Sequence, residues 1–326
     1  MQAVVLEQYG DPEVLTLRDV PNPAAGPEQV VVDIRATALN RADLLQRRGM
    51  YPGPPMVHEI PGMEFCGVVA RVGPGVSRWS PGDEVMGIVG GGAYAEQLSI
   101  HERQLLSVPD GVALADAAAI PEVFLTAFDA LVVQGGLTSG RWALVHAGAS
   151  GVGTASIQIV KALGGFCAVT ASAGKLDRCR QLGADVVIDY NAEDFAEVMA
   201  ERTGGRGVDV VLDVIGGDYT VRNIKALRVG GRIIQVGVMG GATVELPLGM
   251  LLPKRASIIG TVLRARPLEE KVALTMQVEA ELLPLFTTGQ LTPVIDSRYG
   301  LADIAEAHRY METNANVGKI LIDVAG

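Results

Sequence analysis

The chain has 326 residues, of which 48% are hydrophobic and 20% charged, and its formal net charge is −10. This length allows two domains with separate cores, and the hydrophobic content excludes wholesale disorder. The acidic balance argues against nucleic-acid partners, and three Cys residues are too few for a disulfide framework.

The N-terminal part of the chain contains short apolar segments separated by Gly and Pro. Strands are predicted at 30–40 and 65–73, with tight turns at Pro81–Asp83 and Gly90–Gly92. This pattern is typical of a small irregular barrel. A helix at 121–134 then leads into a different region.

The middle of the chain alternates strands with helices. Helices are predicted at 152–163, 175–182 and 192–202. The strands are predicted at 142–145, 166–171, 186–189, 208–214, 232–238 and 257–263. Such alternation predicts a parallel sheet with helices on both faces. Beyond it, we predict a helix over 267–288, extended chain at 291–294, a helix at 301–313 and a strand at 319–324.

The most informative motif lies at the junction between the first of these strands and its helix. Gly148 and Gly153 fit the ends of G-x-G-x-x-G, while Ser150 takes the place of the middle glycine, with Gly151 next to it. Missing side chains let a pyrophosphate approach the backbone, and the helix N-terminus offers free N–H groups to the anion. The motif alone is weak, but this strand–turn–helix context predicts a dinucleotide site.

The end of the second strand indicates which dinucleotide is bound. NAD sites usually place Asp or Glu there to bind the ribose 2′-hydroxyl. The segment 169–175 has no carboxylate but contains Ser172 and Lys175. A hydroxyl and a positive charge suit a 2′-phosphate, so we predict NADPH rather than NADH. The alternative for Lys175 is an ordinary solvated lysine.

Several segments together resemble one family. They are Ala38–Asp43, Gly49–Pro52, Pro61–Glu64, Gly73–Val76, Gly82–Val85, the nucleotide loop through Lys161, Gly230–Arg232, 307–312 and Val317–Ile320. The chain resembles the medium-chain dehydrogenase/reductase superfamily, specifically its zinc-free quinone oxidoreductases, and looks closest to the p53-induced and zeta-crystallin-like group. The resemblance covers essentially the whole chain.

The resemblance implies an α/β fold in two domains. A GroES-like, mostly-β catalytic domain would comprise residues 1–122 and 267–326, and a Rossmann domain with a doubly wound parallel sheet would comprise 123–266. The active site would lie between them. A homodimer or homotetramer is expected, because pairing through the exposed edge near 257–263 would cover an unpaired strand.

The resemblance also implies a set of cofactor contacts. Ser150, Gly151, Val152 and Gly153 would hold the pyrophosphate, and Ser172, Lys175 and Tyr190 would surround the 2′-phosphate. The nicotinamide half would contact Asn40, Thr126, Val236, Gly237, Val238, Met239, Leu263 and Asn316. Each of these has a plain structural alternative, such as a core filler or a turn residue.

Zinc chemistry is not expected. The related zinc enzymes carry Cys, His and Cys where this chain has Asn40, Met63 and a residue near Phe124, and a catalytic zinc needs about three such ligands. The four His residues are far apart in sequence, and His146 is interpreted as a satisfied core residue. Without a Lewis acid to hold an alkoxide, alcohol oxidation is disfavoured, and reduction of a quinone or enone is favoured.

Two residues are candidates for the catalytic site. Tyr51 could donate a hydrogen bond to the developing oxyanion, or it could merely anchor its loop. Asn40 could bridge cofactor and substrate, or it could only cap the following helix. Asp43 and Gln46 are interpreted as mainly structural, and Glu64 is expected to pair with an Arg.

Three functions remain open. The first is an NADPH-dependent quinone reductase, and the second is an enoyl-thioester or enone reductase, for which Arg47 and Arg48 are the only hint of a coenzyme A site. The third is a non-catalytic, NADPH-responsive binding protein. No secretory signal or membrane-spanning run is visible, so we expect a cytoplasmic protein with no membrane partner.

Overall fold

The computed structural model describes residues 1–51 and 53–324. It divides into two compact units, the first comprising residues 1–125 and 264–326 and the second 126–263. The sequence predicts these boundaries at 122/123 and at 266/267.

The second unit is built on a six-stranded parallel sheet. Its strands are β8 (Trp142–Val145), β9 (Phe166–Ala171), β10 (Val186–Asp189), β11 (Val208–Asp213), β12 (Leu227–Gln235) and β13 (Ser257–Gly260). Their spatial order is β10-β9-β8-β11-β12-β13, and every neighbouring pair is parallel. This is the order of the Rossmann doubly wound fold, in which ligands bind at the carboxyl ends of the strands.

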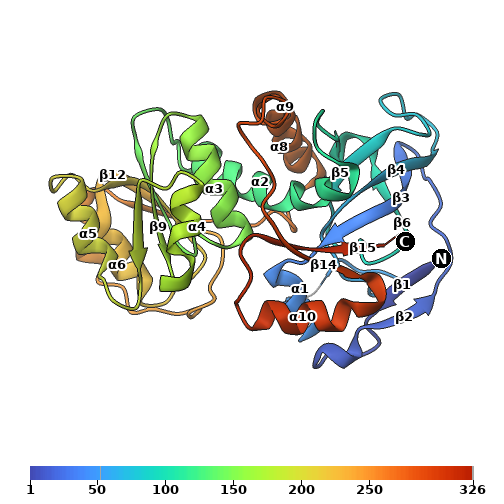
Figure 1. Ribbon diagram of the computed structural model, residues 1–326, viewed down its shortest axis with the longest axis horizontal. Coiled ribbons are helices and arrows are strands. Elements are labelled where there is room, and N and C mark those ends of the chain that lie inside the picture. Colours follow the sequence, from blue (N-terminus) through green and yellow to red (C-terminus); the bar gives the residue numbers. More distant parts are fainter. Residues whose placement is uncertain (52, 325–326) are drawn as a thin grey trace. The chain divides into compact units, whose positions relative to one another are not determined.

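Helices cover both faces of this sheet. Figure 1 shows α3 (Gly151–Ala162) and α4 (Leu176–Gln181) along one face and α5 (Phe195–Arg202) and α6 (Tyr219–Ala226) along the other. Both α6 and the short α7 (Leu251–Lys254) are additions to the sequence prediction. The core contains β-branched and aliphatic side chains of the strands, together with Phe195 and Met199 of α5.

The first unit is built on a seven-stranded, largely antiparallel sheet. Its members are β3 (Gln29–Ala38), β4 (Glu64–Val72), β5 (Glu84–Ile88), β6 (Gln97–His101), β7 (Leu105–Ser107), β14 (Ile295–Gly300) and β15 (Lys319–Asp323). The order is β14-β15-β3-β4-β5-β7, with β6 also paired to β3. Because β15 pairs with β3, both ends of the chain build this sheet.

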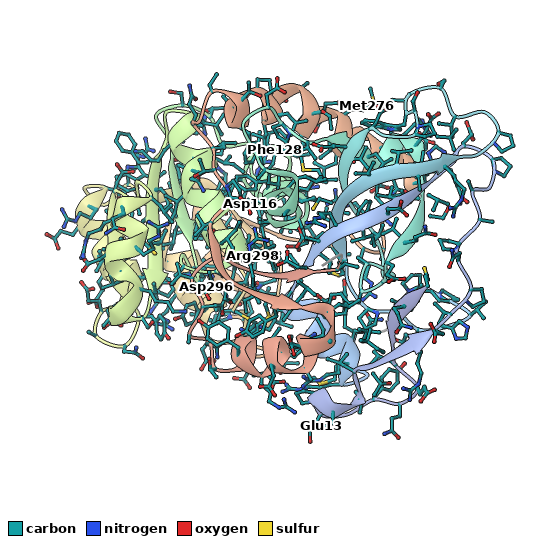
Figure 2. All side chains as sticks on the ribbon, turned by 45° about the vertical axis from the view of Figure 1, so that its right-hand side comes forward. Glu13, Asp116, Phe128, Met276, Asp296 and Arg298 are labelled. Carbon is teal, nitrogen blue, oxygen red and sulfur yellow. The ribbon has the colours of Figure 1, made fainter. Side chains whose placement is uncertain are left out.

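The rest of the first unit is a hairpin and several helices. The hairpin joins β1 (Gln2–Val5) and β2 (Thr16–Asp19). The α-helices are α1 (Arg41–Arg47), α8 (Leu268–Glu281), α9 (Leu283–Thr287) and α10 (Ile304–Glu312). Short 3-10 turns are η1 (Pro12–Val14), η2 (Glu102–Gln104), η3 (Leu114–Ala119) and η7 (Leu301–Asp303). Figure 2 shows Arg298 of β14 beside Asp116 of η3, and Arg298 also donates to Asp323 at 2.9 Å.

Several predicted boundaries were wrong. The helix expected from 192 begins only at Phe195, because the Asp194 carboxylate caps it by accepting from the N–H of Ala196 at 2.8 Å. The fifth strand ends at Gln235 rather than 238, because the next two N–H groups both turn onto the carbonyl of Asp213. The sixth strand ends at Gly260 rather than 263.

Two further predictions need correction. Extended chain was predicted at 291–294, whereas the strand is Ile295–Gly300, held by parallel pairing to β15. The helix predicted at 121–134 is α-helical only over α2 (Pro121–Phe128) and continues as a π-helical segment, η4 (Asp129–Gln134). Remaining short turns of the second unit are η5 (Ala173–Lys175) and η6 (Leu248–Met250).

Candidate functional site

The glycine-rich turn forms an anion cradle at the start of α3. Ser150 is the N-cap, and its hydroxyl oxygen accepts from the N–H of Gly153 at 3.0 Å. The N–H groups of Gly151 and Val152 have no acceptor among the described residues. Ser150 therefore stabilises the helix without closing the cradle, and two amides remain for a phosphate.

The cradle also requires close backbone packing. A Cβ at Gly148 would lie 2.5 Å from Cβ of Val169 on β9, and a Cβ at Gly153 would lie 2.4 Å from the carbonyl oxygen of Ala147. Only glycine fits both positions, as expected for a turn in which helix and strand approach each other closely.

The other predicted cofactor residues of the second unit follow its strands. Ser172 comes directly after β9, and Tyr190, which is 44% exposed, comes directly after β10. The segment Val236–Met239 follows β12, and Leu263 lies three residues beyond β13. The carboxyl ends of these parallel strands form one edge of the sheet, so the structure brings these segments to the edge that the cradle occupies.

A buried polar chain fixes the loop after β11. Asp213 accepts from the N–H groups of Ile215 at 2.6 Å and Gly216 at 3.0 Å and from the Asn223 amide at 2.9 Å. The Asn223 oxygen lies 2.7 Å from Nε2 of His146, whose Nδ1 lies 3.0 Å from the Thr170 hydroxyl. The interpretation of His146 as a satisfied core residue is confirmed, and burial lowers its pKa.

A buried ammonium forms the centre of a second cluster, in the first unit. Nζ of Lys319, at the start of β15, lies 2.7 Å from each of three oxygens, namely Oε1 of Glu64, Oδ1 of Asn40 and the carbonyl of Leu39. The other oxygen of Glu64 accepts from the N–H of Glu122 at 2.8 Å. The expected Arg partner of Glu64 was therefore wrong: the cation is a lysine.

This cluster determines how Asn40 is oriented. Its Oδ1 accepts from Lys319, and its Nδ2 donates to Oε1 of Glu64 at 2.8 Å and to the carbonyl of Ala38 at 3.3 Å. Asn40 is also the N-cap of α1 and is 7% exposed. Its amide is thus held by polar partners from β3, β4 and β15.

The donor set does not fit a zinc ion. The resemblance places the family's zinc ligands at Asn40, at Met63 and near Phe124. Met63 and Phe124 are both buried, and neither the thioether of Met63 nor the ring of Phe124 can replace imidazole or thiolate. Across residues 1–51 and 53–324, no group of three or more His, Cys, Asp and Glu could hold a metal. The nearest fixed cation to Asn40 is the Lys319 ammonium.

Tyr51 lies against a half-buried arginine. The guanidinium carbon of Arg264 is 4.9 Å from the centroid of the Tyr51 ring. Burial raises the pKa of the Tyr51 phenol, the charge of Arg264 opposes that rise, and the carboxylate of Glu122 adds to it. The phenol therefore keeps its proton at neutral pH and can donate a hydrogen bond.

Asp43 occupies the end of another buried polar chain. Its carboxylate accepts from the N–H of Asn40 at 2.8 Å, the N–H of Gly62 at 3.3 Å and the hydroxyl of Tyr94 at 3.1 Å. His308 lies 3.4 Å from Tyr94 and 3.5 Å from Nη1 of Arg47, which can only donate, so His308 Nδ1 accepts.

Burial shifts the pKa values of two groups in this polar chain, Asp43 and His308, in opposite directions. Complete burial raises the pKa of Asp43 to about 6, against the lowering effect of the Asn40 N–H and of the Lys319 charge. Burial also lowers the pKa of His308 to about 3, and the neighbouring Arg47 adds to that effect. Arg47, predicted as a hint of a coenzyme A site, is completely buried and binds Glu312.

The remaining predicted residues are placed as follows. Thr126 is buried in α2, and Asn316 is half-buried, with its amide donating to the carbonyl of Gly318 at 2.9 Å. Gln46 of α1, which the sequence analysis interprets as mainly structural, donates to Glu59 and accepts from Arg264. Sequence reasoning missed Arg264 and the role of Lys319; the only signal was the position of Lys319 in a family motif.

Two family matches cover most of the chain. Residues 26–110 match the alcohol dehydrogenase GroES-like domain, and residues 182–322 match the zinc-binding dehydrogenase family. The synaptic vesicle membrane protein VAT-1 homolog of Rattus norvegicus is 31% identical over 341 residues, covering 99% of this chain and 84% of that protein. Quinone oxidoreductase-like protein 2 of the same species is 31% identical over 314 residues, covering 95% and 89%.

A segment of a much longer protein is also similar. A type I phenolphthiocerol synthesis polyketide synthase of Mycobacterium marinum is 37% identical over 305 residues, which cover 92% of this chain and 14% of that protein.

Solved structures agree with this assignment over the whole chain. Escherichia coli quinone oxidoreductase complexed with NADPH has a TM-score of 0.90 at 29% identity, covering 99% of this chain and 100% of that one. JamJ enoyl reductase has a TM-score of 0.90 at 27% identity, covering 99% of each chain. An NAD-dependent alcohol dehydrogenase has a TM-score of 0.88 at 33% identity, covering 100% of each.

These matches, with the Rossmann sheet and the GroES-like unit, define an oxidoreductase. The chain belongs to the medium-chain dehydrogenase/reductase superfamily, in its quinone oxidoreductase-like group. Structures of relatives hold NADPH, so NADP(H) binding is a property found in this family. Among the described residues, no helix is long and apolar enough to cross a membrane.

Proposed function

We propose that this protein is a metal-independent reductase that uses NADPH to reduce quinones. The observation that carries the proposal is the fixed ammonium of Lys319 beside Asn40 and Glu64, at a position where zinc-dependent relatives would need metal ligands. A site without a Lewis acid favours acceptors that take hydride readily, because a quinone spreads the added charge onto its oxygens.

The cofactor assignment rests on the second unit. The N–H groups of Gly151 and Val152 would bind the pyrophosphate, and Ser172 and Lys175 would bind the 2′-phosphate, since segment 169–175 offers no carboxylate to repel it. When bound, NADPH supplies the hydride. Tyr190, Val238 and Met239 leave apolar surface at the same sheet edge, which suits the flat faces of the cofactor.

The acceptor assignment rests on the first unit. The Tyr51 phenol would donate a hydrogen bond to the acceptor oxygen as it gains negative charge. Asn40 would act through its fixed orientation rather than as a mobile amide, because three protein partners already hold it. Thr126, Leu263 and Asn316 stay predicted cofactor contacts.

A second function is favoured by a specific similarity. The polyketide synthase segment and the JamJ enoyl reductase share this fold, so an enone or enoyl thioester is the alternative acceptor. The same phenol would then bind the thioester oxygen. Burial of Arg47 removes one of the two charges that could have met a coenzyme A phosphate.

Turnover assays with two acceptors distinguish a quinone reductase from an enoyl-thioester reductase. NADPH oxidation would be followed with 1,2-naphthoquinone and with crotonyl-CoA in parallel, with NADH as the cofactor control. We expect turnover with the quinone and a preference for NADPH. Turnover with crotonyl-CoA alone would make the protein an enoyl reductase. Tight NADPH binding without turnover of either acceptor would contradict both proposals and favour the non-catalytic binding role.

Zinc independence has its own test. After dialysis against a chelator, we expect unchanged quinone turnover and no zinc by elemental analysis. Stoichiometric zinc in the purified protein, with activity lost on its removal and restored by its return, would overturn this part of the proposal.

We also propose that two copies pair through β13 and that the protein is cytoplasmic. The strand forms the edge of the sheet, with Ile258 39% exposed, and Leu248 and Leu252 nearby in sequence are 67% and 77% exposed. Ile258→Lys should yield monomers by sedimentation, while Met276→Lys on exposed α8 of the other unit (Figure 2) should not. A monomeric wild-type protein would disprove the pairing.

A further inference from the structure

Arg264 binds three separate segments of the first unit. Its Nε donates to the carbonyl of Gly90 at 2.6 Å, and its Nη2 donates to Oε1 of Gln46 on α1 at 2.7 Å. Its Nη1 donates to the carbonyl of Tyr51 at 3.3 Å. One guanidinium thus connects the Gly90 turn, the last part of α1 and the segment that carries Tyr51.

The same guanidinium also covers the aromatic ring of Tyr51. Its central carbon lies 4.9 Å from the ring centroid, within the range of a cation–π contact. Arg264 therefore contacts Tyr51 twice, at the backbone and at the ring. Such a double contact limits rotation of the side chain as well as movement of the segment.

The packing around this contact is tight. A Cβ at Gly53 would lie 2.8 Å from Nη2 of Arg264 and 2.8 Å from Nε2 of Gln46. Gln46 is itself held by Glu59, whose Oε1 accepts from Nε2 at 3.0 Å. Polar contacts from several segments therefore fix the guanidinium beside the aromatic ring of Tyr51.

We propose that Arg264 is a positioning residue that fixes the Tyr51 phenol for hydrogen bonding to an acceptor carbonyl. The same guanidinium holds a positive charge against the ring of this donor. This inference rests on the proposed function, because it assigns Tyr51 the donor role. It narrows the substrate class to acceptors whose reduced form carries negative charge on oxygen, such as quinones and enones.

Only arginine can make these hydrogen bonds and stack on the Tyr51 ring at the same time. The guanidinium is planar, donates in several fixed directions and stacks on aromatic rings, whereas a lysine ammonium is a flexible point charge. Lysine at 264 would keep the charge but lose the simultaneous contacts to Gly90, Gln46 and Tyr51. The Arg264→Lys variant therefore separates charge from positioning.

The kinetic test compares Arg264→Met, Arg264→Lys, Tyr51→Phe and the Arg264→Met/Tyr51→Phe double variant. We expect Arg264→Met to lower kcat for 1,2-naphthoquinone by about 10- to 100-fold, because misplaced donors cost this much. The dissociation constant for NADPH should stay unchanged. Arg264→Lys should recover only part of kcat. In the Tyr51→Phe background, loss of Arg264 should cost much less than in the wild type.

Arg103→Met is the matched control, since Arg103 is a more exposed arginine of the same unit that also binds a side chain of another segment, Glu269. It should keep wild-type kcat. Equal losses from Arg264→Met in the wild-type and Tyr51→Phe backgrounds would overturn the proposal, as would full activity of Arg264→Met.

Hydrogen exchange tests the positioning role without activity. The amides of Gly49 and Met50, just before Tyr51, donate to carbonyls of α1. In Arg264→Met, we expect faster exchange at these two amides and unchanged exchange in β9. Unchanged exchange at Gly49 and Met50 would overturn the proposal. If the wild type reduces neither quinones nor enones, the proposed function fails, and this measurement still decides whether Arg264 holds the Tyr51 segment.

Discussion

Lys319 and Glu64 form an ion pair that is shielded from solvent, with Nζ 2.7 Å from Oε1 and side-chain exposures of 4% and 0%. The pair joins β15, near the C-terminal end of the chain, to β4. Because Asn40 contacts both charges, its position depends on the pair remaining intact.

Lys319→Met should destabilise the protein strongly. Removing one partner leaves a carboxylate buried without its counter-charge, which typically costs about 3–5 kcal/mol. The free energy of unfolding would be measured by urea denaturation. The Lys319→Met/Glu64→Gln double variant should recover much of the loss, because it removes both charges. A single variant as stable as the wild type would show that the pair contributes nothing.

Gly153→Ala should abolish or severely weaken NADPH binding. Its new Cβ would lie 2.4 Å from the Ala147 carbonyl oxygen and 2.5 Å from the carbonyl carbon of Gly148, so the turn must shift. The control is Gly249→Ala, where no atom lies within 4 Å of the new Cβ. Calorimetric titration with NADPH measures the difference; equal affinities for the two variants would disprove the cradle.

Lys175→Ala should change the preference between cofactors. If Lys175 binds the 2′-phosphate, its loss removes a charged hydrogen bond and should raise the dissociation constant for NADPH about 10-fold. The dissociation constant for NADH should not change. Lys225→Ala, an exposed lysine of α6, is the control. A parallel loss of affinity for both cofactors would indicate a folding defect instead of phosphate recognition.

Local patterns predicted the second unit well. The bounds of β8, β9 and β10 were predicted to the residue, because apolar runs between Gly-rich turns mark buried parallel strands. Beyond Val208 the prediction weakened. Helix α6 was missed, and the end of β12 depends on a carbonyl of Asp213 in another strand. Such tertiary hydrogen bonds leave no periodic signal.

The same distinction applies to the candidate site. Cradle residues follow one another along the chain, so spacing alone locates them. In the Lys319–Glu64–Asn40 cluster and the Arg264–Tyr51 contact, the basic residue lies more than two hundred positions after its partners. A single sequence contains each residue but nothing that pairs them. This is why Glu64 was assigned an arginine partner and Arg264 no role.

Asp43 should make stability depend on pH in an unusual direction. Its pKa is about 6 in the folded protein, against 3.8 as the ordinary value, so the folded state holds a proton that the unfolded state has released. The contribution of Asp43 to stability is therefore fully present below about pH 4 and is lost as the pH rises through about 6. A rise from 3.8 to about 6 corresponds to about 3 kcal/mol.

The free energy of unfolding of the wild type and of Asp43→Asn would be measured by urea denaturation between pH 4 and pH 7. The quantity of interest is the wild-type value minus the Asp43→Asn value at each pH. His308 and other titrating groups occur in both proteins and largely cancel, and the exposed Asp110→Asn controls for losing one carboxylate. We expect this difference to fall as the pH rises. Because Lys319, Arg264 and the Asn40 N–H all favour the charged carboxylate, a difference that instead grows with pH would mean that these groups outweigh burial.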